Sequence, residues 1–289
     1  MIKQEAVMAL KDKIKRMFRY IIKGVPNVTI KGNICTLEPS SQFEGKTCIV
    51  TGGSSGIGYE IAKKWIDCGG TVLITGRNEE KLIKAKKELG DRCYSLAFDS
   101  TDIEHCEDFM NKAKNILGDI TSLVCNAAVC YDTGGILNTD IKSYREHFAA
   151  NIDGYYFMTQ AFLKTIDMDA DHSVLMISSE RGFQCDDCPY GLTKAAVNSL
   201  IKGINRRLYA KGIRVNGIAP GVVVTDMSPW ASRDNLYMDG ASSQRCFLPE
   251  EIAEVAIFLL SDAAKCISGE IITCDAGNYL DSHICGTIY

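Results

Sequence analysis

The sequence predicts an α/β fold in which one doubly wound sheet of seven parallel strands carries helices on both faces. From residue 46 onward, short apolar runs rich in β-branched residues alternate with amphipathic helical segments. A glycine-rich turn joins the first apolar run to the first helix of this alternation. The 289 residues, 46% hydrophobic and 24% charged, are enough to bury one large core.

An N-terminal amphipathic helix is predicted ahead of the sheet, over residues 2–23. Seven basic and two acidic side chains give this segment a net charge of +5. The pattern favours an arm packed on its own domain or on a neighbouring subunit, and an anionic membrane surface or a protein partner are the alternatives. Residues 24–43 then form a linker, so the predicted units are 1–43 and 44–289. The apolar stripe of the helix consists of Val7, Leu10, Ile14, Met17, Phe18 and Ile21.

The main domain divides into seven strands and six helices. The predicted strands are Thr47–Thr51, Thr71–Thr75, Tyr94–Phe98, Ser122–Cys125, Ser173–Ser178, Arg214–Ala219 and Ile271–Cys274. The predicted helices are Ile57–Cys68, Glu79–Leu89, Ile103–Leu117, Ile141–Ile166, Tyr190–Ala210 and Pro249–Ser261. A right-handed crossover between successive parallel strands places the helices on both faces of the sheet.

Charge and cysteine content narrow the class of protein. The net charge of −4 gives no signature of nucleic-acid binding. No apolar run approaches the roughly 20 residues of a transmembrane helix, and no secretory signal is recognisable, so a cytoplasmic protein is expected. Thirteen cysteines, an odd number scattered singly through strands and helices, fit free thiols in a reducing compartment.

The glycine-rich turn, Thr51 to Gly58, has glycines at 52, 56 and 58 in a G-x-x-x-G-x-G spacing. Gly52 permits a tight turn, Gly56 lets the backbone approach a pyrophosphate, and Gly58 lets the helix pack on the strand. The helix amino terminus favours the anion. The turn therefore predicts a dinucleotide site, although a plain turn would share this composition.

The end of the second strand indicates which dinucleotide is bound. About 20 residues after the glycines, folds that bind NAD place a carboxylate on the ribose 2′-hydroxyl. This sequence has Gly76-Arg77-Asn78 there. A guanidinium can pair with a 2′-phosphate, so NADP(H) is favoured over NAD(H), the alternative being a solvated arginine.

The helix beginning near Pro189 carries Tyr190 and Lys194 four residues apart, hence on one face. A nearby cation favours phenolate and is expected to lower the pKa of Tyr190 toward that of a general acid or base.

Taken together, the chain resembles the short-chain dehydrogenase/reductase family, whose Rossmann fold matches the prediction. The resemblance spans about Phe43 to Leu280. It rests on motifs in family order: Thr51-Gly-Gly-Ser-Ser-Gly-Ile-Gly58, Asp99, Asn126-Ala127-Ala128, Asn151, Ser178-Ser179, Tyr190-x-x-x-Lys194 and Pro220-Gly221-Val222-Val223-Val224-Thr225.

The resemblance implies four catalytic residues. Tyr190 would exchange the proton with a carbonyl or alcohol, and Lys194 would lower its pKa and hold the nicotinamide ribose. Ser179 would bind the substrate oxygen, and Asn151 would hold a water of a proton relay.

The resemblance also implies a cofactor-binding set. Asp99 would approach adenine, Asn126 and Ala127 the adenosine ribose, and Val223 with Thr225 the carboxamide. The full set is Gly52, Ser54, Ser55, Gly56, Ile57, Gly58, Arg77, Asn78, Asp99, Ser100, Asn126, Ala127, Ala128, Tyr190, Lys194, Pro220, Gly221, Val223 and Thr225.

Three departures from the family pattern stand out. Cys125 and Ala128 replace the first Asn and the Gly of Asn-Asn-Ala-Gly. Ser179 precedes Tyr190 by eleven residues, fewer than is usual, which leaves Ser178 as the alternative substrate contact. The Asp-Gly-Gly of the family reads Asp275-Ala276-Gly277.

Two segments should border the substrate. Residues 185–188, Cys-Asp-Asp-Cys, have a metal-ligand spacing, but no second Cys/His pair accompanies them, so free thiols and acids at the mouth are favoured and no metal is expected. Residues 226–247 occupy the place of the family's substrate lid. Its apolar side chains, which shape a pocket or only pack, are Met227, Trp230, Tyr237, Met238 and Phe247.

The predicted function is therefore NAD(P)(H)-dependent interconversion of a carbonyl and a secondary alcohol. Sugar, 3-oxoacyl, steroid and small ketone substrates all remain open. By family resemblance a homodimer or homotetramer is expected. A catalytically silent scaffold is the alternative from another class, and recruitment of the enzyme to a membrane surface by its basic helix is a variant of the first hypothesis.

Overall fold

The computed structural model describes residues 29, 31, 42–131, 133–239 and 241–280. The predicted helix over residues 2–23, almost all of the linker and the tail 281–289 lie outside the described residues. The described chain enters the core at Phe43, whose ring stacks on Trp65 at a centroid distance of 3.8 Å. Within these described ranges, no helix combines the length and hydropathy needed to cross a membrane.

Seven strands form one sheet in the order β3-β2-β1-β4-β5-β6-β7, and every neighbouring pair is parallel. This confirms the predicted fold class. The strands of the sheet are β1 (Thr47–Thr51), β2 (Thr71–Gly76), β3 (Cys93–Ala97), β4 (Ser122–Cys125), β5 (Ser173–Ile177), β6 (Arg214–Pro220) and β7 (Ile271–Cys274).

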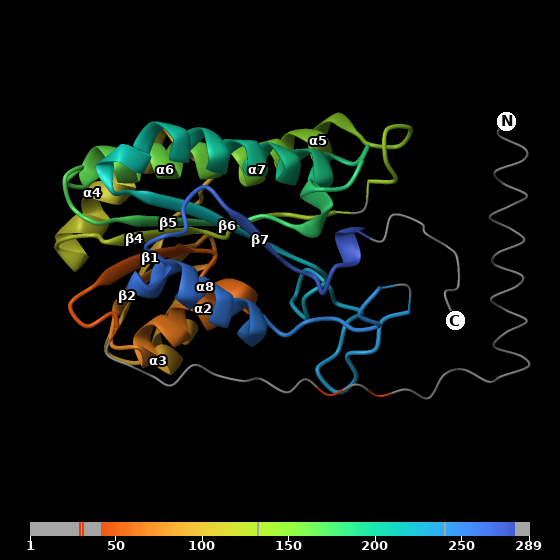
Figure 1. Cartoon of the computed structure of the whole chain (residues 1–289), viewed down its shortest axis with the longest axis horizontal. Helices are drawn as coiled ribbons and strands as arrows, with labels where there is room; N and C mark the ends of the chain where they lie inside the picture. Colours follow the sequence, from red (N-terminus) through yellow and green to blue (C-terminus); the bar gives the residue numbers. More distant parts are fainter. Residues whose placement is uncertain (1–28, 30, 32–41, 132, 240, 281–289) are drawn as a thin grey trace, which may run out of the picture.

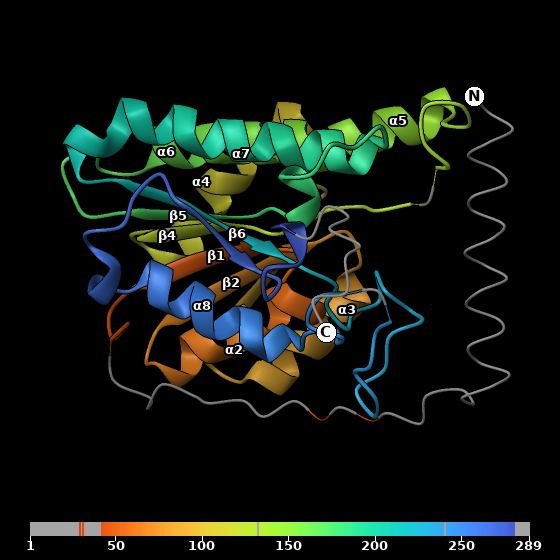
Figure 2. The same cartoon turned by 45° about the vertical axis from the view of Figure 1, so that its right-hand side comes forward.

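Helices cover both faces of this sheet (Figure 1). The two layers of helices remain on opposite sides of the sheet when the molecule is turned (Figure 2). On one face lie α4 (Cys106–Leu117), α6 (Gly154–Thr165) and α7 (Pro189–Leu208), with the short α5 (Ile141–Phe148) continuing the same layer. On the other lie α2 (Gly56–Asp67), α3 (Glu79–Leu89) and α8 (Pro249–Leu260).

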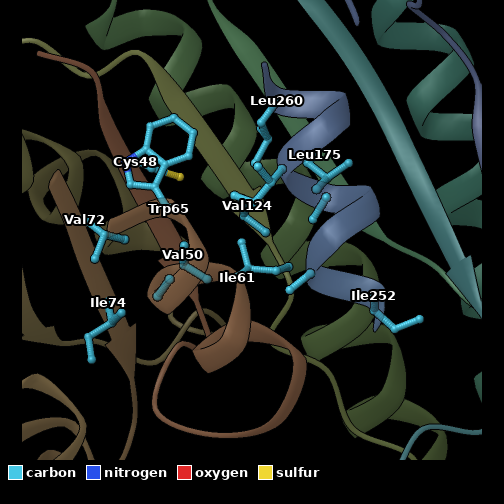
Figure 3. Close-up of a cluster of buried hydrophobic side chains, with 14 of the residues drawn as sticks. Cys48, Val50, Ile61, Trp65, Val72, Ile74, Val124, Leu175, Ile252 and Leu260 are labelled. Atoms are coloured by element: carbon cyan, nitrogen blue, oxygen red, sulfur yellow. The ribbon is translucent and has the colours of Figure 1, made fainter. Parts of the chain in front are cut away.

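Each face has its own hydrophobic core. Figure 3 shows the one in which Ile61 and Trp65 of α2 and Ile252 of α8 meet side chains of β1, β2, β4 and β5. Val50, Val72, Ile74 and Val124 of these strands are fully buried, as expected for a parallel sheet covered on both sides.

The predicted helix Ile141–Ile166 is not continuous. A π-helical turn, Ala149–Asp153, separates α5 from α6 and contains Asn151. Apolar periodicity cannot reveal this turn, because it arises from one extra residue per hydrogen-bonded ring. Two predicted helix ends are 3₁₀ turns instead. Ile103–His105 precedes α4, and Tyr209–Lys211 follows α7.

The strand order has its switch point between β1 and β4. These strands are hydrogen-bonded neighbours, yet the chain leaves β1 toward β2 and β3 and then returns to β4. Such a switch point opens a crevice beyond the strand ends, which is where ligands bind in doubly wound sheets.

The predicted lid, residues 226–247, contains no helix or strand in its described part and is tied to the body by ion pairs. Arg233 forms a bidentate pair with Glu250 at the start of α8, with N–O distances of 2.7 and 3.2 Å. Arg245 forms another with Glu251. Met227 and Trp230 are exposed on this segment. Tyr237, Met238 and Phe247 are half-buried.

Candidate active site

The glycine-rich turn adopts a backbone that glycine alone accepts without strain. Gly52 and Gly56 have φ values of +64° and +56°. The Gly52 amide donates to Thr75 O at 2.8 Å, which ties the turn to the end of β2. A Cβ at Gly58 would lie 2.5 Å from both Gly52 O and the Asn126 amide nitrogen, so this position admits only glycine. The close approach of helix to strand expected from the sequence is present.

The amino terminus of α2 is left without a cap by the described chain. Ser55 is extended, its hydroxyl makes no capping bond, and the first turn holds no acidic residue. By contrast, Asn78 caps α3, which also begins with Glu79 and Glu80. Uncapped backbone N–H groups at the start of a twelve-residue helix suit an anion, so the turn and helix fit the pyrophosphate of a dinucleotide.

The loop after β4 is bonded directly to the glycine-rich turn. The Asn126 side chain donates to Thr51 O at 2.9 Å and to Gly52 O at 3.2 Å. The Thr51 hydroxyl in turn accepts from the backbone amides of Asn126 and Ala127. Asn126 therefore holds the two loops of the crevice together, and Ala128 follows it half-buried. Sequence reasoning missed Thr51 as the partner of this junction.

The adenosine end of the crevice carries the predicted polar residues. Arg77 is exposed at the end of β2, and within the described part of the chain its guanidinium has no hydrogen bond or ion pair. Asn78 next to it accepts from Lys81 N at 2.8 Å. Asp99 is half-buried after β3 and accepts from the amide and hydroxyl of Thr101. The carbonyl oxygen of Ser100 packs against Gly154 at the start of α6. A Cβ added to Gly154 would lie 2.9 Å from this oxygen.

The segment after β6 lies against the other side of the glycine-rich turn. Gly221, after Pro220, donates to Cys274 O at 3.0 Å, and Val223 is buried beside Phe247. A Cβ at Gly56 would be 3.0 Å from the Thr225 methyl. A cavity of about 620 Å³ lies here between the turn, α2 and the segment 224–233.

Lys194 is buried beneath Tyr190 rather than paired with its hydroxyl. Its Nζ donates to Ile177 O at 2.7 Å and lies 5.7 Å from the centre of the Tyr190 ring and 5.2 Å from that of Tyr155. Burial lowers the pKa of Lys194 to about 7, and the nearby Cys130 thiol partly opposes this shift.

The expected lowering of the Tyr190 pKa is not present in this structure, so that prediction was wrong. Burial raises the pKa of Tyr190 well above its usual value, and the Cys130 thiol adds to the effect. A hydrogen bond with Ser179 and the charge of Arg181 work in the opposite direction. Desolvation outweighs these favourable contacts because the phenolate would lie in a site with little water.

The two candidate serines have different surroundings. The Ser178 hydroxyl donates to Asn198 Oδ1 at 2.6 Å and lies 3.3 Å from Lys194 O, facing the inner side of α7. The Ser179 hydroxyl accepts from Arg181 N and hydrogen-bonds with Tyr190. The structure thus brings Ser179, not Ser178, to the Tyr190 hydroxyl.

Asn151 connects α6, α7 and the loop after β4. It is fully buried in the π-helical turn, and its side chain pairs with both the N–H and the C=O of Val129, at 2.9 and 3.0 Å. The same amide donates to the Thr193 hydroxyl at 3.1 Å, which donates to Tyr190 O at 2.7 Å. Asn151, Tyr190 and Lys194 are therefore parts of one packed unit.

Three residues at this unit were missed by sequence reasoning, namely Cys130, Tyr131 and His147. His147 precedes Asn151 by four residues, so the helical spacing already used for Tyr190 and Lys194 would have placed it on the same face. Cys130 and Tyr131 follow the Asn126 motif, but nothing in their residue types marked them.

The loop of residues 185–188 is held by its acidic side chains. Asp186 pairs with Arg181 at 2.5 Å, and Asp187 accepts from Ile136 N at 3.1 Å. Ligand atoms of Asp186, Asp187 and Cys188 lie within 4.8 Å of one another, but both carboxylates already serve these contacts. Cys185 and Cys188 of this loop are free thiols.

Comparison with known proteins gives a consistent family. A family model described as Enoyl-(Acyl carrier protein) reductase matches residues 52–278. A 3-oxoacyl-(acyl-carrier-protein) reductase from Aquifex aeolicus is 30% identical over 247 residues, covering 82% of this chain and 99% of that protein.

Solved structures of similar fold were also compared with this chain. A short-chain dehydrogenase/reductase from Brucella melitensis, described as a glucose/ribitol dehydrogenase, superposes with a TM-score of 0.76 at 27% identity, covering 83% of this chain and 99% of the other. A 3-ketoacyl-(acyl-carrier-protein) reductase from the same organism, complexed with NADH, shares the fold with a TM-score of 0.76 at 24% identity, covering 82% and 99% of the two chains.

Proposed function

Because the chain belongs to the short-chain dehydrogenase/reductase family, an NAD(P)-dependent group of oxidoreductases, we propose that it interconverts a carbonyl compound and a secondary alcohol with NADP(H) as cofactor. The observation that carries the proposal is the meeting of Ser179, Tyr190 and Lys194 at the carboxyl ends of β4 and β5. The relatives include proteins named for acyl and for sugar substrates, so the substrate class follows from none of them.

The proton chemistry belongs to Tyr190. In reduction its hydroxyl protonates the forming alkoxide, and in oxidation its phenolate accepts the proton of the alcohol. Ser179, hydrogen-bonded to Tyr190, donates to the substrate oxygen and stabilises its developing charge. Lys194, with a pKa near neutrality, gains and loses a proton readily, which suits a relay that restores the proton of Tyr190. Asn151 hydrogen-bonds with Val129 and Thr193 and so fixes the loop after β4 against α7, next to this relay.

The cofactor is proposed from the residues at the crevice. When bound, the nicotinamide supplies or accepts the hydride. The uncapped start of α2 and the glycines 52, 56 and 58 would hold the pyrophosphate. Arg77, exposed and without a partner among the described residues, would bind a 2′-phosphate, and it stands where folds that bind NAD carry a carboxylate.

Two further features are part of the proposal. Residues 44–289 form the catalytic unit. The segment 226–247 closes over the substrate, and the ion pairs of Arg233 and Arg245 tie this segment to α8. The enzyme is a homodimer or homotetramer, which light scattering at micromolar concentration tests; a monomer mass would overturn that statement.

The decisive experiment is a fluorescence titration with NADPH and NADH at equal ionic strength, followed by a screen of carbonyl substrates with the tighter cofactor. We expect tighter binding of NADPH and turnover that falls roughly 10²- to 10⁴-fold in Tyr190→Phe, with cofactor affinity retained. Tighter binding of NADH would overturn the NADP(H) assignment. Binding of neither would favour the scaffold alternative.

A further inference from the structure

The loop after β4 is gripped by two side chains that lie four residues apart on α5 and the following π-helical turn. Asn151 binds both backbone groups of Val129, and His147 Nε2 accepts from Tyr131 N at 3.2 Å. The amides of Val129 and Tyr131 therefore both point toward the segment that carries His147 and Asn151. The loop is therefore held at two amides, those of Val129 and Tyr131, by side chains rather than by a neighbouring strand.

His147 is fixed in one tautomer by its partners. The ring is fully buried, and Nδ1 lies 2.7 Å from Ser143 O, a carbonyl that can only accept. Nδ1 therefore carries the hydrogen, and Nε2 offers its lone pair to the Tyr131 amide. Both ring nitrogens are satisfied in this neutral form, which leaves the imidazole no other orientation with equal bonding.

The imidazole also contacts two tyrosine rings edge to face. The ring centroids of His147 and Tyr131 are 5.1 Å apart, and those of His147 and Tyr190 are 6.5 Å apart. Tyr131 is 45% exposed, so part of the residue faces solvent. His147 thus joins the exposed Tyr131 to the proposed acid/base Tyr190.

We propose that His147 is a positioning residue whose acceptor nitrogen holds Tyr131 as one wall of the substrate site. This inference rests on the proposed function, since the His147 ring that packs on Tyr131 also packs on Tyr190. The exposed phenol face of Tyr131 contacts the substrate next to its reacting carbon. Loss of the Nε2 acceptor releases Tyr131 and weakens substrate binding, while the cofactor crevice, which uses Asn126 and Thr51, is unaffected.

Three variants test this proposal. His147→Leu keeps much of the volume but removes the acceptor, whereas His147→Gln retains an oxygen that can accept from the Tyr131 amide. His105→Leu is the matched control, because His105 is exposed and lies before α4. KM, kcat and NADPH affinity are measured together with hydrogen exchange of the Tyr131 amide.

We expect His147→Leu to raise KM roughly tenfold and to speed exchange of the Tyr131 amide at least about tenfold, with NADPH affinity unchanged. His147→Gln should stay within about threefold of wild type in both. An unchanged KM in His147→Leu, or equal damage in both variants, would overturn the proposal.

Two further arms keep the outcome clear. If His147→Leu does not fold, Tyr131→Ala, at an exposed position, should still raise KM with NADPH affinity retained, and an unchanged KM overturns the substrate-wall role. If the wild type turns over no carbonyl substrate, the proposed function fails. Exchange of the Tyr131 amide then still tests whether His147 holds Tyr131. Equal exchange in wild type and His147→Leu contradicts that positioning role.

Discussion

Lys194 Nζ donates a 2.7 Å hydrogen bond to the carbonyl oxygen of Ile177, and the Tyr155 hydroxyl donates to the same oxygen at 3.1 Å. One backbone carbonyl at the end of β5 thus anchors the lysine, while the face of the Tyr155 ring lies 5.2 Å from its nitrogen. Among the described residues Lys194 has no ion-pair partner, so it is a buried amine held only by neutral groups. Such an environment favours the uncharged form of the amine.

Lys194→Met should stabilise the fold at low pH at the expense of activity. Between pH 7 and about 10, the unfolded lysine binds a proton that the folded one, with a pKa of about 7, does not. Wild-type stability therefore rises with pH in this window. Below pH 7 the variant should be more stable by on the order of a few kcal/mol, and Tyr155 still satisfies Ile177 O. Urea unfolding from pH 6 to 10 measures the difference.

The control for this measurement is Lys112→Met, an exposed lysine on α4. Its stability difference from wild type should not depend on pH over the same range. A Lys194→Met difference that is equally constant from pH 6 to 10 would mean that Lys194 does not titrate near neutrality in the folded protein.

Alanine at the two neighbouring serines should separate stability from catalysis. Ser178→Ala removes a buried bond to Asn198 and should lower the free energy of unfolding by about 1–2 kcal/mol, with kcat nearly unchanged. Ser179→Ala should lower kcat roughly 10²-fold with little change in stability, since its hydroxyl lies at Tyr190. Thermal unfolding and steady-state kinetics on both variants decide the assignment; the reverse pattern would transfer the substrate contact to Ser178.

Arg77→Ala should act on one cofactor only. Loss of a guanidinium that pairs with a 2′-phosphate should weaken NADPH binding roughly 10- to 100-fold and leave NADH binding unchanged. Arg207→Ala, an exposed arginine near the end of α7, removes the same charge at a distance from the crevice and serves as the control. Equal losses of NADPH affinity in both variants would indicate a general charge effect.

Gly58→Ala should disrupt the junction of the two crevice loops. The added methyl would stand 2.5 Å from Gly52 O, a backbone atom that cannot rotate away. We expect a loss of stability of about 1–3 kcal/mol and weaker binding of NADPH. Gly203→Ala in α7 meets nothing within 4 Å and should instead stabilise by up to about 1 kcal/mol. Calorimetry and cofactor titration on the pair distinguish crowding from a general effect of alanine.

The fold was accessible from the sequence because its central strands are buried on both faces. Runs such as Val174–Ile177 must be continuously apolar under those conditions. The bounds of β1, β4 and β7 were predicted to the residue. The break at Ala149–Asp153 was not, because a π-helical turn leaves the apolar pattern of the helix nearly intact.

The amino-acid sequence by itself determined the parallel sheet, the glycine turn at its switch point and the chemical types available at the carboxyl ends of the strands. Periodicity and spacing act over a few residues, and they suffice for those features. Only the tertiary structure decided which groups meet and how buried they are. Burial sets the pKa values of Tyr190 and Lys194 in directions that spacing alone could not give. The contact of His147 with Tyr131 likewise depends on how the loop after β4 packs against α5.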